Sequence, residues 1–163
     1  MPPAIKTKDV ARELEELARP AKSAHDLMSQ IVELLHDRML KYNWVGFYML
    51  ETPSNGEPPV LVLGAFQGAM TPHTRIHLHQ GICGAAASTG KTVIVDDVSK
   101  DPRYLACSLE TKSEIVVPVF VRGKVVGELD IDSHFPSAFK DEDRELVERC
   151  ALLVGQHLEK SRK

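Results

Sequence analysis

The chain has 163 residues, of which 43% are hydrophobic and 26% are charged, and this composition indicates one globular domain rather than a disordered or fibrous protein. Its 20 Lys and Arg residues against 23 Asp and Glu give a formal net charge of −3. Nucleic-acid-binding domains usually carry excess positive charge, so that class is excluded. No signal-peptide pattern or membrane-spanning run is found, and three cysteines favour reduced thiols. We therefore expect a cytoplasmic protein.

Two helices are expected near the N-terminus. Residues 8–18 place apolar side chains at helical spacing, and Pro20 ends this helix. A second helix begins near Ser23, a suitable N-cap, and runs to about Tyr42. Its apolar stripe consists of Leu27, Ile31, Leu34, Leu35 and Met39.

The hydrophobic pattern then changes to one typical of β-strands. Residues 44–50 and 60–66 are rich in aromatic and β-branched side chains and flank a turn-rich segment, which predicts a β-hairpin. Residues 74–79 alternate between polar and apolar. They predict a further strand with Ile76 and Leu78 pointing inward.

A short helix over residues 81–90, closed by a glycine, and a short strand over 93–95 follow. Residues 96–112 are polar, have little periodicity and contain Cys107. A loop of this length in a compact domain usually forms a lid or a site.

The C-terminal third predicts a second hairpin and a helix. Residues 113–121 and 124–133 are apolar runs joined by a tight turn. From Asp141 to about Lys160, an acidic first turn and an apolar stripe predict the closing helix.

This order of elements contains no strand–helix–strand repeat, so it predicts an α+β fold. We expect an antiparallel sheet of about six strands with the N- and C-terminal helices packed on it. Residues 1–22 are predicted to form a helical extension, and residues 23–163 the domain itself.

Several strings resemble those of the GAF domain family, and more narrowly those of the free methionine-R-sulfoxide reductases. They are NWVGFYML (43–50), LGAFQG (63–68), GICGAA (81–86), AC (106–107), SEIVVPVF (113–120), GKVVGELDIDS (123–133) and FKDED (139–143). The resemblance extends over roughly residues 25–160 with the family's spacings. It implies a single GAF-type domain that uses a thiol to reduce the R epimer of free methionine sulfoxide, with an external thiol reductant such as thioredoxin and without a cofactor.

The resemblance also implies roles for individual residues. Cys107 matches the family's catalytic cysteine, and Cys83 matches a second cysteine of its three-cysteine set. The acids around the substrate and the aromatic side chains that line the pocket match Glu114, Asp130, Asp132, Trp44 and Tyr48.

One position departs from the family pattern. His73 stands where the family has its usual resolving cysteine, and Cys150 lies on the apolar stripe of the last helix, where a packing role is expected. Recycling of oxidised Cys107 would then fall to Cys83 or directly to an external dithiol. We therefore expect the reductase to be impaired in turnover.

The residues themselves are compatible with this chemistry. A thiolate must attack the sulfoxide sulfur while an acid protonates the oxygen that leaves. Asp130 and Asp132 are two positions apart on a strand, hence on one face and about 7 Å apart. With Glu114 nearby, one carboxyl can stay protonated near neutral pH, while the others hold the ammonium of a free amino acid.

Other interpretations stay open from the sequence. A GAF domain that binds a small ligand without catalysis is the main alternative, because the fold alone does not decide function. Cys83, Trp44 and Tyr48 are also compatible with plain core packing.

The sequence also contains a group of potential metal ligands. His73, His77, His79 and Cys83 form a local cluster with donor atoms suited to zinc. Their spacing is not a recognised zinc motif, and His77 and His79 are expected on a solvent-facing side, so no metal site is predicted. A homodimer is expected by analogy with GAF relatives.

Overall fold

The computed structural model describes residues 7–78, 80–104 and 109–161. Within these ranges, one antiparallel sheet has six strands in the order β3-β2-β1-β6-β5-β4. The strands are β1 (Trp44–Glu51), β2 (Val60–Gln67), β3 (Arg75–His77), β4 (Val93–Val95), β5 (Ser113–Val121) and β6 (Lys124–Ser133). The predicted α+β class and the antiparallel sheet are confirmed.

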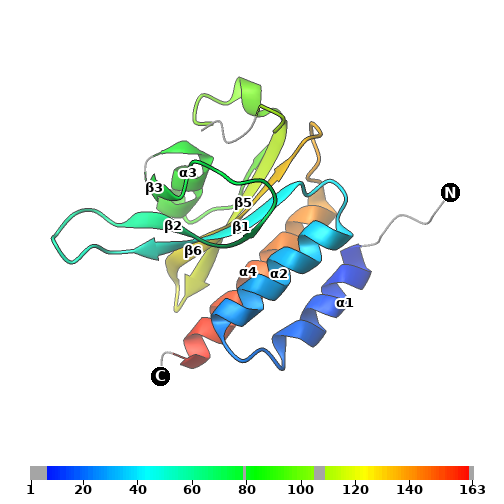
Figure 1. Cartoon of the computed structure of the whole chain (residues 1–163), viewed down its shortest axis with the longest axis vertical. Helices are drawn as coiled ribbons and strands as arrows, with labels where there is room; N and C mark the ends of the chain where they lie inside the picture. Colours follow the sequence, from blue (N-terminus) through cyan, green and yellow to red (C-terminus); the bar gives the residue numbers. More distant parts are fainter. Residues whose placement is uncertain (1–6, 79, 105–108, 162–163) are drawn as a thin grey trace.

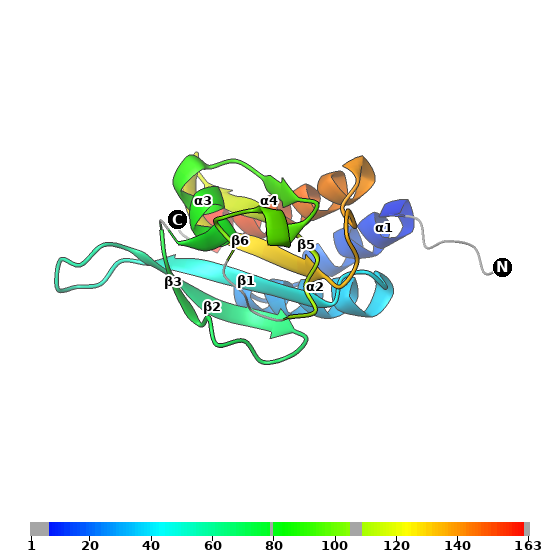
Figure 2. The ribbon, with the colours of Figure 1, turned by 90° about the horizontal axis from the view of Figure 1, so that it is seen from above.

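Helices cover both faces of this sheet. They are α1 (Thr7–Ala18), α2 (Ala24–Arg38), α3 (Gly81–Thr89) and α4 (Asp141–Ser161), with a 3₁₀ turn η1 (Val98–Lys100). Helices α2 and α4 lie on one face, with α1 packed outside them, and α3 lies on the opposite face (Figures 1 and 2). None of the helices in the described ranges is long and apolar enough to cross a membrane.

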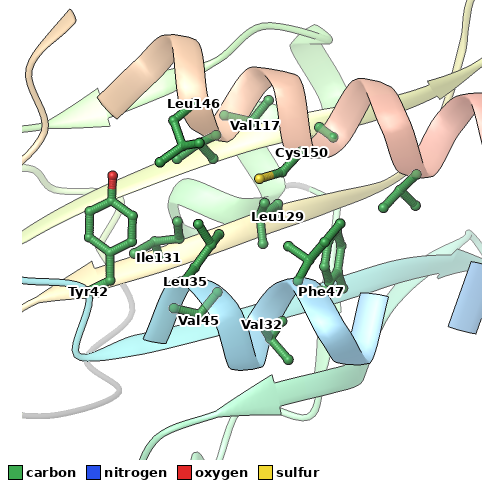
Figure 3. Packing of buried hydrophobic residues seen from close by; sticks show 14 of the residues in the cluster. Val32, Leu35, Tyr42, Val45, Phe47, Val117, Leu129, Ile131, Leu146 and Cys150 are labelled. Carbon is green, nitrogen blue, oxygen red and sulfur yellow. The ribbon is translucent and has the colours of Figure 1, made fainter. Parts of the chain in front are cut away.

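The larger hydrophobic core lies between the sheet and helices α2 and α4 (Figure 3). Its side chains come from both helices and from alternate positions of β1, β5 and β6, as the strand periodicity predicts. Members include Val32, Leu35, Tyr42, Val45, Phe47, Val117, Leu129, Ile131, Leu146 and Cys150. Cys150 is fully buried, so its predicted packing role is confirmed.

Helix α1 is part of this packing. Val10 and Leu14 are fully buried in the larger core. Arg38 of α2 donates two hydrogen bonds to the Glu13 carboxylate, at 2.6 and 2.8 Å. The N-terminal helix is therefore held to the domain by apolar contacts and by an ion pair.

The second helix ends earlier than the sequence pattern indicates. Ser23 caps it as predicted, because its side chain accepts a hydrogen bond from the Asp26 backbone N–H at 3.0 Å. The predicted end near Tyr42 is wrong, since the chain turns to an extended conformation at Met39. This change brings Tyr42 into the core, where its hydroxyl donates a hydrogen bond to Asp143 Oδ1 at 2.5 Å.

Two further details differ from the prediction. Strand β3 spans only three residues, because it pairs at the sheet edge with Val60–Val62 alone. Ile76 points inward as expected and is 4% exposed, whereas Leu78 follows the strand and is partly buried. The predicted loop over residues 96–112 contains the turn η1, which Asp97 caps through a hydrogen bond from the Ser99 N–H.

Candidate active site

The strand register places acidic side chains on one face of the sheet. Glu114 of β5 lies directly opposite Asp132 of β6, and Asp130 lies opposite Val116. Since alternate residues of a strand share a face, Asp130 and Asp132 both point toward the side covered by α3. All three acids are buried, with exposed fractions of 5% or less. The structure thus brings together the three acids predicted from the sequence.

Helix α3 carries Cys83 onto this cluster. The Cys83 thiol donates a hydrogen bond to Asp130 Oδ2 over 3.3 Å. The close approach requires Gly84, because a Cβ at that position would lie 2.8 Å from the carbonyl oxygen of Leu78. A run of small residues therefore lets the helix sit against the segment that follows β3.

A narrow cavity opens beside these groups. It is lined by Tyr48, His73, Ile76, Gly81, Ile82, Cys83, Glu114 and Asp130. Its volume is about 10 Å³, room for about one water molecule. The described residues that line it include no lysine or arginine.

Burial changes the protonation of the acids. Loss of hydration raises the pKa of Glu114 well above its usual range, and the charges of Asp130 and Asp132 raise it further. Burial likewise raises the pKa of Asp132, to which the charge of Asp130 adds, and the pKa of Asp130 itself. The cluster therefore retains protons at pH values where exposed carboxyls are ionised.

The same environment acts on the thiol. Burial raises the pKa of Cys83 well above its ordinary value, and the charges of Asp130, Glu128 and Glu114 raise it further. Cys83 is thus held as a neutral thiol, in contrast to a cysteine activated by neighbouring positive charge.

A fourth acid, Glu128, was missed in the sequence analysis. It is fully buried, and within the described ranges neither of its carboxyl oxygens has a hydrogen-bond partner. Burial raises its pKa well above the usual range. Residues 128, 130 and 132 of β6 are each two positions apart and therefore lie on the same face of the strand. This spacing is the sequence signal that could have identified Glu128.

The predicted aromatic residues line the same face. The Trp44 ring stacks on Phe66 with centroids 5.8 Å apart, and it lies 6.2 Å from the Tyr48 ring. The Tyr48 hydroxyl donates a hydrogen bond to the carbonyl oxygen of His73 at 2.7 Å. Tyr48 lines the narrow cavity directly, whereas Trp44 reaches this region through its contact with Tyr48.

Two residues of interest from the sequence analysis lie outside the described residues: Cys107, expected to be the nucleophile, and His79. Of the other histidines in the local cluster, His73 lines the cavity and His77 is exposed on β3. Among the described members of that cluster, only Cys83 and His73 therefore line the cavity beside the acids.

The match to known families agrees with the fold. Residues 23–158 match the GAF domain. This range includes all six strands and helices α2, α3 and most of α4.

The chain belongs to the GAF domain family. Its relatives include the free methionine-R-sulfoxide reductase of Saccharomyces cerevisiae, which is 44% identical over 70% of this chain and 62% of that protein. The protein of the same name from Escherichia coli is 34% identical over 84% of this chain and 79% of its own length. The resemblance stated from the sequence is thereby confirmed.

A solved structure gives the same result. A free methionine-R-sulfoxide reductase from Neisseria meningitidis, in complex with its substrate, superimposes with a TM-score of 0.87 at 33% identity. The match covers 96% of this chain and 90% of the Neisseria chain. These three relatives are thus reductases.

Proposed function

We propose that this GAF domain reduces free methionine-R-sulfoxide to methionine, with Cys107 as the nucleophile. The similarity to reductases from three organisms supports the reaction. The observation that carries the proposal is the buried cluster of Glu114, Asp130 and Asp132 beside the cavity, because this chemistry needs both a proton donor and a cation-binding group.

The cluster supplies the group that selects a free amino acid. An ionised carboxylate among the three acids binds the substrate ammonium, and no lysine or arginine among the described lining residues competes for it. A peptide-bound methionine sulfoxide has no ammonium at this position and is excluded. Methionine sulfoxide is larger than the narrow cavity, so the cavity widens when the substrate binds.

The chemical step uses a proton held by the cluster. The Cys107 thiolate attacks the sulfoxide sulfur while a carboxylic acid gives its proton to the oxygen. Two electrons pass from the cysteine sulfur to the substrate sulfur, and methionine leaves. The S–O bond of the substrate breaks, and the protonated oxygen is transferred to the Cys107 sulfur, which becomes a sulfenic acid. Glu114 is the best proton donor, since burial and two neighbouring charges raise its pKa.

Recycling requires two further electrons. The neutral, buried Cys83 thiol is a poor nucleophile, which favours direct reduction over internal resolution. An external dithiol such as thioredoxin then converts the sulfenic acid to the thiol, releases water and becomes a disulfide. His73 cannot form the family's usual internal disulfide, so multiple-turnover rates are expected to be low.

The remaining parts of the proposal concern the cellular compartment and the oligomeric state. We place the enzyme in the cytoplasm, where thiols stay reduced and thioredoxin-like donors operate. A homodimer is proposed because two-fold dimers are the commonest closed assembly. A solution mass equal to one chain would contradict the dimer.

Methionine release tests the function. It is measured from free R-sulfoxide, free S-sulfoxide and a peptide-bound sulfoxide, with dithiothreitol and then with thioredoxin. Release should be confined to the free R epimer, be lost in Cys107→Ser and persist in Cys150→Ala, the matched thiol control. Absence of release with both reductants would contradict the reductase and would indicate a ligand-binding GAF domain.

A further inference from the structure

Three potential metal ligands converge beneath α3. Within the described ranges, Cys83 Sγ and one carboxyl oxygen each of Glu114 and Asp130 all lie within 4.8 Å of one another. They come from three separate elements, α3, β5 and β6, and all three residues are buried. The convergence is a tertiary feature and not a run of acids along one surface.

A buried pair of acids points to a cation at this place. Asp130 is 2% exposed, and its Oδ1 has no hydrogen-bond partner within the described residues other than a proton held by the neighbouring Glu114 carboxyl. The cavity beside it is lined by two acids and a thiol, and the described lining includes no lysine or arginine. Two buried carboxyls that share a proton are costly to ionise, and a bound cation that takes the place of this proton removes that cost.

The donor set indicates which cation. Magnesium and calcium prefer oxygen ligands alone, whereas a thiolate combined with carboxylates suits the borderline-soft Zn²⁺. Sulfur and oxygen ligands of tetrahedral zinc are roughly 3.6 Å apart, and Cys83 Sγ lies 3.3 Å from Asp130 Oδ2. The cavity of about 10 Å³ admits an ion without widening, unlike the amino acid.

We propose that Cys83, Glu114 and Asp130 form a binding site for a thiophilic divalent cation of the Zn²⁺ class, and that this cation competes with the free amino acid. When the metal binds, a metal–sulfur bond forms and the thiol proton passes to the buffer, with no change in oxidation state. The competition between the cation and the amino acid rests on the reductase function proposed above. The binding of the cation does not depend on that function.

Binding is tested without turnover, in the Cys107→Ser protein, which removes the Cys107 thiol as a competing ligand. Co²⁺ serves as the spectroscopic probe for thiolate ligation, and Zn²⁺ is titrated by calorimetry. We expect one equivalent of metal, a near-ultraviolet thiolate-to-cobalt absorption band, and displacement of Co²⁺ by Zn²⁺. Free methionine-R-sulfoxide should weaken the apparent metal affinity, because both ligands need the same carboxylates.

Matched variants in this background locate the ligands. Outer partners of a metal site already contribute about 10- to 100-fold in affinity, so Cys83→Ser should remove the band and weaken binding at least about 100-fold. Glu114→Gln should weaken binding at least about 10-fold. Cys150→Ala, which lies in the other core, should retain both band and affinity. Zn²⁺ should raise the melting temperature of the parent but not that of Cys83→Ser. A cooperative thermal transition in Cys83→Ser also shows that this variant folds.

The outcomes separate the two proposals. A band that survives Cys83→Ser, or absence of metal binding in the parent, overturns the site. Metal binding in a protein without reductase activity would leave the site in place and refute the function. With Cys107 present, Zn²⁺ should raise the apparent KM for free methionine-R-sulfoxide. The substitution Cys83→Ser should raise the inhibition constant of Zn²⁺ at least about 10-fold. Equal inhibition of both proteins would overturn the competition.

Discussion

Glu114 and Asp132 face each other as a directly opposed pair on β5 and β6, and both carboxyls are buried. Like charges in such a cross-strand pair destabilise a sheet, and burial increases the cost. The pair is tolerated because the pKa values of both residues are raised, so protons are retained. The packing of the sheet thus holds a proton donor for the proposed reaction.

This relationship predicts how stability depends on pH. Carboxyls with raised pKa values bind more protons in the folded state than in the unfolded chain. Stability therefore falls as pH rises from the unfolded value, about 4, toward the raised folded value, by about 1.4 kcal/mol per pH unit for each group. The melting temperature should decrease between pH 5 and pH 8. Glu114→Gln should give a shallower decrease, and a melting temperature that rises over this range would contradict the prediction.

Periodicity in the sequence was enough to predict most of the fold. Strands β1 and β6 alternate between two buried faces, and α4 carries a continuous apolar stripe. The early end of α2 could not be predicted, because Met39 continues the apolar stripe although the chain turns extended there. Packing of Tyr42 in the core outweighs the local helical pattern of apolar residues.

The site was predictable only in part. Because alternate residues of a strand share a face, Asp130 and Asp132 of β6 lie on the same face of the sheet, and the same argument applies to Glu128. The contact of Cys83 with Asp130 could not be predicted, because it joins positions 47 residues apart through the docking of α3 onto the sheet. Sequence separation carries no information on that docking.

Glu128 is expected to reduce stability in the wild-type protein. It is fully buried, and its oxygens have no hydrogen-bond partner within the described ranges. Since burial disfavours its charged form, Glu128→Gln should stabilise the fold by about 1–3 kcal/mol at pH 8 and have little effect at pH 5. Thermal melts at both pH values measure this. Glu57→Gln, at an exposed position, is the control and should change neither melt.

Substrate affinity should depend on the acids of β6. Asp130→Asn and Asp132→Asn keep the side-chain size but remove a carboxyl that can ionise, and we propose that an ionised carboxyl of this cluster binds the substrate ammonium. Because hydrogen bonds to charged groups contribute about 1.5–3 kcal/mol, KM for free methionine-R-sulfoxide should rise about 10- to 150-fold. Steady-state kinetics with dithiothreitol provide the measurement. An unchanged KM in both variants would remove the acids from substrate binding.

Cys150 should affect stability and not catalysis. It lies in the larger core, on the sheet face opposite the acids, and is fully buried. A hydroxyl in this apolar setting costs about 1–3 kcal/mol, so Cys150→Ser should lower the melting temperature by about 2–10 °C. Its kcat/KM, measured well below the melting temperature, should match that of Cys150→Ala. A loss of activity in both variants would contradict the separation of the two cores.

Gly46 is expected to position the Trp44 ring beside the site. It lies on β1 opposite Asp130, and a Cβ there would come within 2.3 Å of Trp44 Cη2. Gly46→Ala must therefore displace the Trp44 ring, which stacks on Phe66 and donates a hydrogen bond to the Ala69 carbonyl oxygen at 3.0 Å. Overpacking of this kind costs about 1–3 kcal/mol, so the melting temperature should fall by about 2–10 °C.

The same displacement should alter the site, and a matched glycine separates this effect from a general one. Gly64 lies on the adjacent strand β2, where a Cβ would make only an ordinary contact, 3.5 Å from the Phe47 carbonyl oxygen. Gly64→Ala should therefore keep both the melting temperature and KM close to wild type, whereas Gly46→Ala should raise KM for free methionine-R-sulfoxide severalfold. If both variants destabilise the fold equally and leave KM unchanged, Trp44 packs the second core without shaping the substrate pocket.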